Sequence, residues 1–115
     1  MVEHPRRGDM YWVDFELTCG SEQGGRRPAL VVQNDVGNRF APLTIVVPLT
    51  RSTPKKNYPF MVRITGIGDI DESWVHCGHV RTIDKSRLAE GVLTQLDRAT
   101  MHRVDDALRA SLGLY

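Results

Sequence analysis

Residues 10–17 read MYWVDFEL, a stretch in which Tyr11, Val13, Phe15 and Leu17 alternate with Met10, Trp12, Asp14 and Glu16. A period of two is typical of a β-strand that buries one of its faces. The tripeptide Arg7-Gly8-Asp9 comes directly before this stretch, and we interpret it as the turn from which the strand starts. The sequence therefore predicts a half-buried strand near the N-terminus.

Several more short strands are expected along the chain. β-Branched runs at 29–33 and 43–49 are separated by the turn residues Asn34, Asp35, Gly37 and Asn38. Further runs lie at 60–65, 73–77 and 80–83, so the fold should contain five or six strands. Consecutive strands of this length favour an antiparallel sheet that is twisted and partly closed.

Near the end of the chain the spacing of the apolar residues changes from that of a strand to that of a helix. Asp97 can cap the start of a helix and Gly113 can follow its last turn. One face of that helix would carry Met101, Val104, Ala107, Leu108 and Leu112. A shorter helical turn is expected at 84–90, with Asp84 as its cap. The expected fold class is thus mainly β with α, an antiparallel barrel of five to six strands with a C-terminal helix packed against it.

Length and composition favour one ordinary globular domain over 1–115. The chain has 115 residues, of which 41% are hydrophobic and 25% charged, and its formal net charge is +1. A charge so close to zero gives no argument for or against a nucleic-acid partner. Two cysteines, Cys19 and Cys77, are too few for a disulfide framework. We find no apolar run of about 20 residues and no signal-peptide pattern, so we expect a cytoplasmic protein.

The basic residues concentrate in two loops. Residues 20–28 read GSEQGGRRP, which places Arg26 and Arg27 beside flexible glycines, and the stretch 51–63 has four cations and no acid. Arginine offers a planar fork that matches phosphate oxygens, and glycine allows close approach of the backbone to a ligand. The loop at 20–28 could bind an anion, or it could be a solvated hairpin loop whose arginines keep a sheet edge soluble.

Histidine and tryptophan give weaker signals. His76, Cys77 and His79 lie close in sequence, but neighbouring residues of a strand point to opposite faces and no fourth ligand is near, so we expect no metal site. A ribonuclease that uses two histidines as acid and base stays open. We interpret Trp12 and Trp74 as core or interface residues rather than base-stacking platforms.

Two runs, RGDMYWVDF at 7–15 and GSEQGGRRPALVV at 20–32, closely resemble the MazF/PemK family of toxin ribonucleases from bacterial type II toxin-antitoxin systems. The resemblance continues through VVPLT at 46–50, YPF at 58–60 and VRTIDKSRL at 80–88, and so covers nearly the whole chain in order. The pattern joins a strand start, a glycine-rich loop ending in Arg-Pro, and a hydroxyl residue at the end of a later strand.

This resemblance implies a homodimer of SH3-like barrels of the CcdB/PemK type that cuts single-stranded RNA without a metal, a cofactor or the ribosome, and that a cognate antitoxin neutralises. The products would carry a 2′,3′-cyclic phosphate and a 5′-hydroxyl. The catalytic residues of the family fall on Arg27 and Thr50, and Glu22 matches an acid of the loop. The positions that meet RNA or shape the site fall on Ser21, Gln23, Asn34, Ser73 and His79.

The sequence departs from the family at two positions. Many relatives have glutamine where this chain has His79, and an acidic residue where it has Gly78, so the preferred RNA sequence is open. Two other functions are compatible with this architecture. A relative of the same architecture poisons DNA gyrase through its C-terminal helix without catalysis, and an SH3-like module could simply bind RNA or peptide. Arg27 together with Thr50 argues against both.

Overall fold

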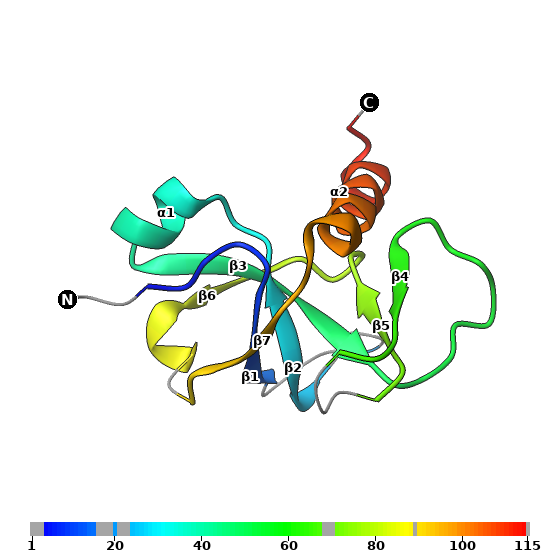
Figure 1. The fold of residues 1–115 in the computed structure, drawn as a ribbon, viewed down its shortest axis with the longest axis horizontal. Coiled ribbons are helices and arrows are strands. Elements are labelled where there is room, and N and C mark those ends of the chain that lie inside the picture. The colour runs from blue at the N-terminus through cyan, green and yellow to red at the C-terminus, as the bar shows by residue number, and fades with distance from the viewer. Residues whose placement is uncertain (1–3, 16–19, 21–23, 68–70, 89, 115) are drawn as a thin grey trace.

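The computed structural model describes residues 4–15, 20, 24–67, 71–88 and 90–114. These residues form a curved antiparallel sheet with a long helix packed across one face and a short helix at one end (Figure 1). The strands are β1 (Asp9–Phe15), β2 (Gly25–Val31), β3 (Leu43–Thr50), β4 (Met61–Ile64), β5 (Ser73–His76), β6 (Arg81–Asp84) and β7 (Val92–Gln95). The helices are α1 (Asp35–Phe40), the 3-10 helix η1 (Lys85–Leu88) and α2 (Arg98–Leu112). No helix in these parts of the chain is long and apolar enough to cross a membrane.

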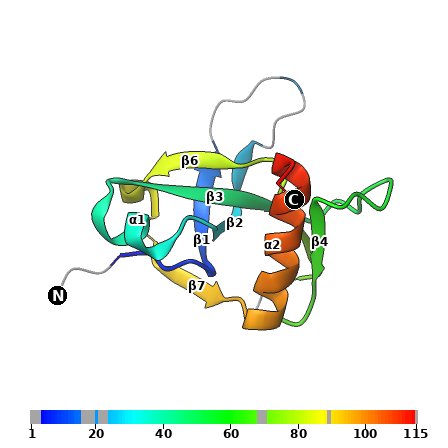
Figure 2. The ribbon, with the colours of Figure 1, turned by 90° about the horizontal axis from the view of Figure 1, so that it is seen from above.

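Strand β3 is the centre of the sheet. The strand order is β4-β5-β3-β2-β1-β7, and β6 also pairs with β3. The first half of β3 pairs with β6, from Leu43 opposite Asp84 to Val46 opposite Arg81, whereas its end pairs with β5. Because β3 exchanges one neighbour for another along its length, the sheet curls towards a half-barrel, as Figure 2 shows from above. This confirms the expected fold class.

The alternation in β1 fills two cores, one on each face of the sheet. Met10 packs with Leu30, Val47, Val75 and the α2 residue Val104. On the other face a second cluster contains Tyr11, Val13, Phe15, Ala29, Val31, Val46, Ile83 and Leu88. The expectation of a half-buried strand is therefore wrong at Met10, which is buried on the second face, whereas Trp12 is half-buried and Asp14 is exposed.

The two expected helices are confirmed. Asp97 caps α2 by accepting a hydrogen bond from the backbone N–H of Thr100, and Gly113 ends it in the left-handed conformation at φ 70°. Asp84 accepts from the N–H of Ser86 at the start of η1. The expected apolar face of α2 is wrong at its last position, because Leu112 is 56% exposed and only the earlier residues of that face pack on the core.

The turn expected at 34–38 is wrong, because the chain forms α1 there. Asn34 caps this helix through a 2.8 Å hydrogen bond from the N–H of Gly37. Asn38 is fully buried, and its Oδ1 accepts from Thr44 Oγ1 of β3 at 2.7 Å. Turn-forming residues also start helices, and here a tertiary contact selects the helix.

Strand β7 was not expected. Val92 and Leu93 are both largely exposed, so the segment lacks the alternation by which strands are recognised. Its pairing partner β1 defines it, with Gln95 opposite Asp9 and Thr94 opposite Met10. Gln95 Nε2 also donates to the buried Asp9 carboxylate at 2.6 Å.

The turn expected at Arg7-Gly8-Asp9 is confirmed, with Gly8 at φ 98°.

Candidate active site

Arg27 lies on β2, and hydrogen bonds hold its guanidinium at the end of β3. Its Nε donates to the carbonyl of Gly24 at 2.9 Å, and its Nη1 donates to the carbonyl of Leu49 at 3.3 Å. Both contacts are to backbone carbonyl oxygens, and they orient the guanidinium towards the end of β3. A half-buried arginine placed in this way can stabilise an anion at the end of β3.

Thr50 is the last residue of β3 and is buried apart from 8% of its surface. Its Oγ1 accepts a hydrogen bond from the N–H of Ser52 at 3.2 Å, which orients the hydroxyl. Since that bond uses a lone pair of the oxygen, the hydroxyl hydrogen can be donated to an anionic ligand.

Strand pairing places both residues in one row. The paired residues of β2 and β3 end with Ala29 opposite Pro48, and the same register continued by two residues sets Arg27 opposite Thr50. Directly opposed residues of antiparallel strands share a face of the sheet. The row continues, because Thr50 pairs with Trp74 of β5 and Trp74 pairs with Arg63 of β4. We call Arg27, Thr50, Trp74 and Arg63 the cross-strand row.

The other expected site residues are not all in this row. Glu22, Ser21 and Gln23 lie outside the described residues. Asn34 caps α1 beyond the opposite end of β2 from Arg27, so the structure does not bring it to the row. Ser73 begins β5, is buried, and donates to the carbonyl of Asp71 at 2.9 Å. Alternation along β5 puts Ser73 on the opposite face from Trp74.

His79 belongs to a stack of four rings, which we call the ring stack. Its ring lies 4.1 Å from that of His76, His76 lies 5.6 Å from Phe60, and Phe60 lies 5.0 Å from Tyr58, each measured between ring centroids. Neighbouring planes differ by only about 20°. The stack joins the end of β5 to the segment before β4, and the sequence pattern alone did not reveal it.

Gly78 leaves room for the ring stack. A Cβ at this position would lie 2.9 Å from His76 Cε1 and 3.1 Å from Phe60 Cδ1, closer than side-chain atoms normally approach. The N–H of Gly78 also donates to His76 Nδ1 at 3.2 Å, which requires an unprotonated Nδ1. The two departures from the family pattern, Gly78 and His79, therefore form one structural feature.

We expect His76 to make the fold sensitive to acid. Burial lowers the pKa of His76 below its ordinary value of 6.5, and the neighbouring His79 lowers it further. Between the folded pKa and 6.5 the unfolded chain binds more protons than the folded chain, so the free energy of unfolding falls as pH falls through that range. Urea unfolding between about pH 8 and pH 5 should show this loss, and His76→Phe should reduce it. An equal loss in the variant would contradict the assignment.

Cys77 is buried, and burial raises the pKa of its thiol to about 12, with Asp105 adding to the effect. A thiol that stays protonated is a poor nucleophile and a poor metal ligand. The part of the chain that the structure describes contains no group of three or more His, Cys, Asp or Glu side chains arranged to hold a metal ion.

Comparison with protein families identifies the fold. Residues 6–112 match the family described as PemK-like, MazF-like toxin of type II toxin-antitoxin system. The chain is 45% identical to endoribonuclease EndoA of Bacillus subtilis (strain 168) over 111 residues, which cover 95% of each chain. It is 43% identical to endoribonuclease MazF of Staphylococcus epidermidis, over 95% of this chain and 92% of the relative.

Solved structures of related toxins have the same fold. MazF of Deinococcus radiodurans superposes with a TM-score of 0.80 at 30% identity, covering 97% of this chain and 99% of that one. A mycobacterial endoribonuclease in complex with its cognate antitoxin superposes with a TM-score of 0.79 at 28% identity, covering 96% and 97%. The chain therefore belongs to the PemK/MazF family of toxins of type II toxin-antitoxin systems.

Proposed function

We propose that this protein is an endoribonuclease toxin that cuts single-stranded RNA at short specific sequences, independently of metal ions and of the ribosome. The observation that carries the proposal is the Arg27 guanidinium, which hydrogen bonds orient beside Thr50 at the end of β3. Relatives at 43% and 45% identity are named endoribonucleases, which supports the same class of reaction here.

The chemistry needs few protein groups. The 2′-hydroxyl of the RNA loses its proton and attacks the adjacent phosphorus, and the bond to the 5′-oxygen of the next nucleotide breaks. The departing 5′-oxygen takes a proton from water, so the products are a 2′,3′-cyclic phosphate and a 5′-hydroxyl. Arg27 would stabilise the negative charge that develops on the phosphate oxygens, and Thr50 would donate a hydrogen bond to the same phosphate. Arginine is a poor base because it keeps its proton. We propose Glu22 as the candidate that accepts the 2′ proton.

Single-stranded RNA is the substrate that this chemistry favours, because its bases can separate and enter a groove whereas a duplex hides their edges. We further propose that the toxin acts as a cytoplasmic homodimer and that a cognate antitoxin neutralises it. A related mycobacterial endoribonuclease has been solved in complex with its cognate antitoxin, which supports the second partner. An acidic antitoxin segment would complement the cations at 51–63.

A cleavage assay tests the proposal. Purified protein is incubated with a long single-stranded RNA in the presence of EDTA, and the new ends are mapped. We expect discrete fragments with 5′-hydroxyl ends, and His76→Ala with His79→Ala should still cut. Intact RNA under these conditions, or cleavage that EDTA abolishes, would reject the proposal. Intact RNA together with inhibition of DNA gyrase would favour the gyrase-poison alternative.

A further inference from the structure

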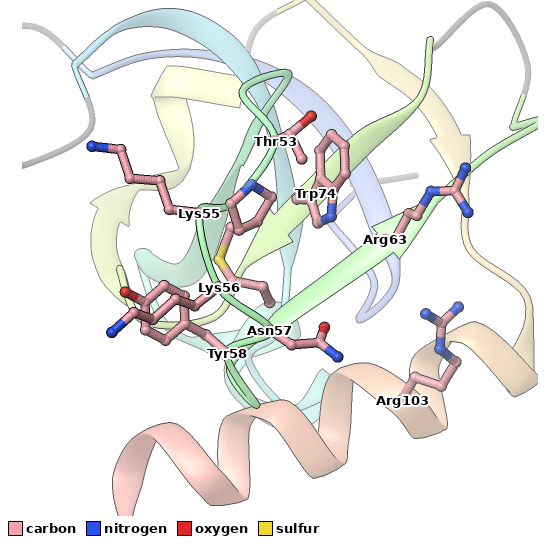
Figure 3. A pocket seen from close by; sticks show the side chains of 10 residues that line it. Thr53, Lys55, Lys56, Asn57, Tyr58, Arg63, Trp74 and Arg103 are labelled. Carbon is pink, nitrogen blue, oxygen red and sulfur yellow. The ribbon is translucent and has the colours of Figure 1, made fainter.

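A cleft of about 420 Å³ opens beside β4 and β5, and Arg27 is not one of its lining residues. Trp74 lies in the cleft, with Arg63 of β4 and Arg103 of α2 on one side of it and Lys55 on the other (Figure 3). Lys56 also lines it, and none of the described lining residues is acidic. The volume is in the range of small-ligand pockets, and an aromatic ring among cations suits a ligand with both a flat ring and a negative charge.

Trp74 differs in its surroundings from the other tryptophan. The Arg26 guanidinium covers the ring of Trp12, 4.5 Å from its centroid. Trp74 is half-buried and forms part of the wall of the cleft. Trp74 was expected to be a core or interface residue. It is not in the core, because the buried side chains of β5 are those of its neighbours Ser73 and Val75, and an interface role stays a prediction.

The cleft continues directly from the candidate active site. Trp74 pairs with Thr50 on one side and with Arg63 on the other, so it is the next side chain along the cross-strand row. Adjacent strands are about 4.8 Å apart, so a chain that leaves a phosphate at Thr50 along the row meets the indole first and the arginines next.

We propose that this cleft is a subsite for a nucleotide that flanks the cut, with its base stacked on Trp74 and its phosphate held by Arg103. The inference rests on the proposed function, since it assigns the path of the same RNA. Arg63 is ion-paired with Glu72 on the surface, where such pairs contribute little, so a phosphate can compete for it. Lys55 and Lys56 would add attraction that does not depend on sequence.

The test is binding of a defined RNA. The probe is a fluorescent single strand of about 12 nucleotides, centred on a cut site mapped with the wild type, with 2′-deoxyribose at the cut so that it cannot react. Trp74→Leu should weaken binding roughly 5- to 150-fold, the effect expected from loss of one base stack. Scanning the probe with single abasic nucleotides should reveal one flanking position that weakens wild-type binding and has no further effect on Trp74→Leu.

Arg103→Gln tests the charge without touching the core, because Arg103 is exposed on α2. It should lower the slope of log affinity against log salt by about 0.7, the value for one phosphate contact on a single strand. The matched control is Arg98→Gln, which removes an exposed arginine of the same helix outside the cleft and should leave the slope unchanged.

The outcomes separate the two proposals. Cleavage by the wild type with RNA binding that is indifferent to Trp74→Leu and Arg103→Gln, in variants with wild-type circular dichroism, overturns the subsite. The subsite is also overturned if these variants weaken antitoxin binding and leave RNA binding unchanged. If the wild type cuts no RNA, the proposed endoribonuclease is rejected, and the subsite is rejected with it because it is defined by the cut that it flanks.

Discussion

Arg27→Ala should slow RNA cleavage by about 10²- to 10³-fold while leaving the fold intact. The side chain is the cation that hydrogen bonds hold beside the end of β3. Removing one pre-organised group that stabilises developing charge costs about 2.7–4 kcal/mol of transition-state stabilisation. Hydrogen bonds from this side chain, such as those to the carbonyls of Gly24 and Leu49, contribute about 0.5–1.5 kcal/mol each to stability, so the protein should still fold. Single-turnover cleavage with circular dichroism measures both.

Arg26→Ala is the matched control for Arg27→Ala. Arg26 is the neighbouring residue of β2, but it faces the other side of the strand, stacks on Trp12 and pairs with Glu90. This variant loses a cation from the same end of β2 without removing the group beside Thr50, so its cleavage rate should stay close to that of the wild type. Equal losses in the two variants would mean that the arginines act only by general attraction of RNA, and the catalytic assignment would fail.

Thr50→Ala should slow the same step by roughly 10- to 150-fold, the equivalent of ~1.5–3 kcal/mol for one hydrogen bond to a charged group. The cost to folding is the contact with the N–H of Ser52, worth about 1 kcal/mol. Thr50→Ser keeps the hydroxyl and should keep most of the activity. A folded Thr50→Ala variant that cuts at the wild-type rate would remove Thr50 from the site.

The double variant Arg27→Ala with Thr50→Ala tests whether the two residues share a phosphate. Groups that act as one unit give losses that do not add. The double variant should therefore be little slower than Arg27→Ala alone. Fully additive losses would show that the two side chains act at different points of the reaction.

Local pattern was enough to predict most of the elements. The two-residue period of β1, the cap at Asp97 and the glycine at 113 depend on contacts within a few residues of the chain, and all three are confirmed. The resemblance through the Gly-rich loop and the Arg-Pro pair also predicted the family, which the comparisons confirm. These are properties of short segments, and a sequence shows them directly.

Elements that depend on a distant partner were missed. Nothing in residues 92–95 marks a strand until β1 lies beside them, and the turn residues at 34–38 form α1 because Asn38 is buried against Thr44. Likewise Leu112 belongs to the apolar stripe of α2 but is exposed, because only the earlier part of that stripe packs on the core.

The sequence by itself determined the strands other than β7, the capped helix and the family, and so nominated Arg27 and Thr50. Only the tertiary structure decided what stands beside them. Register aligns Thr50 with Trp74 and Arg63, residues 24 and 13 positions further along the chain. The rings of Phe60 and His76 occupy the space that a side chain at Gly78 would need. The physical reason is that register and ring packing are set by which strands pair, and pairing is a free-energy balance over the whole sheet that no single segment contains.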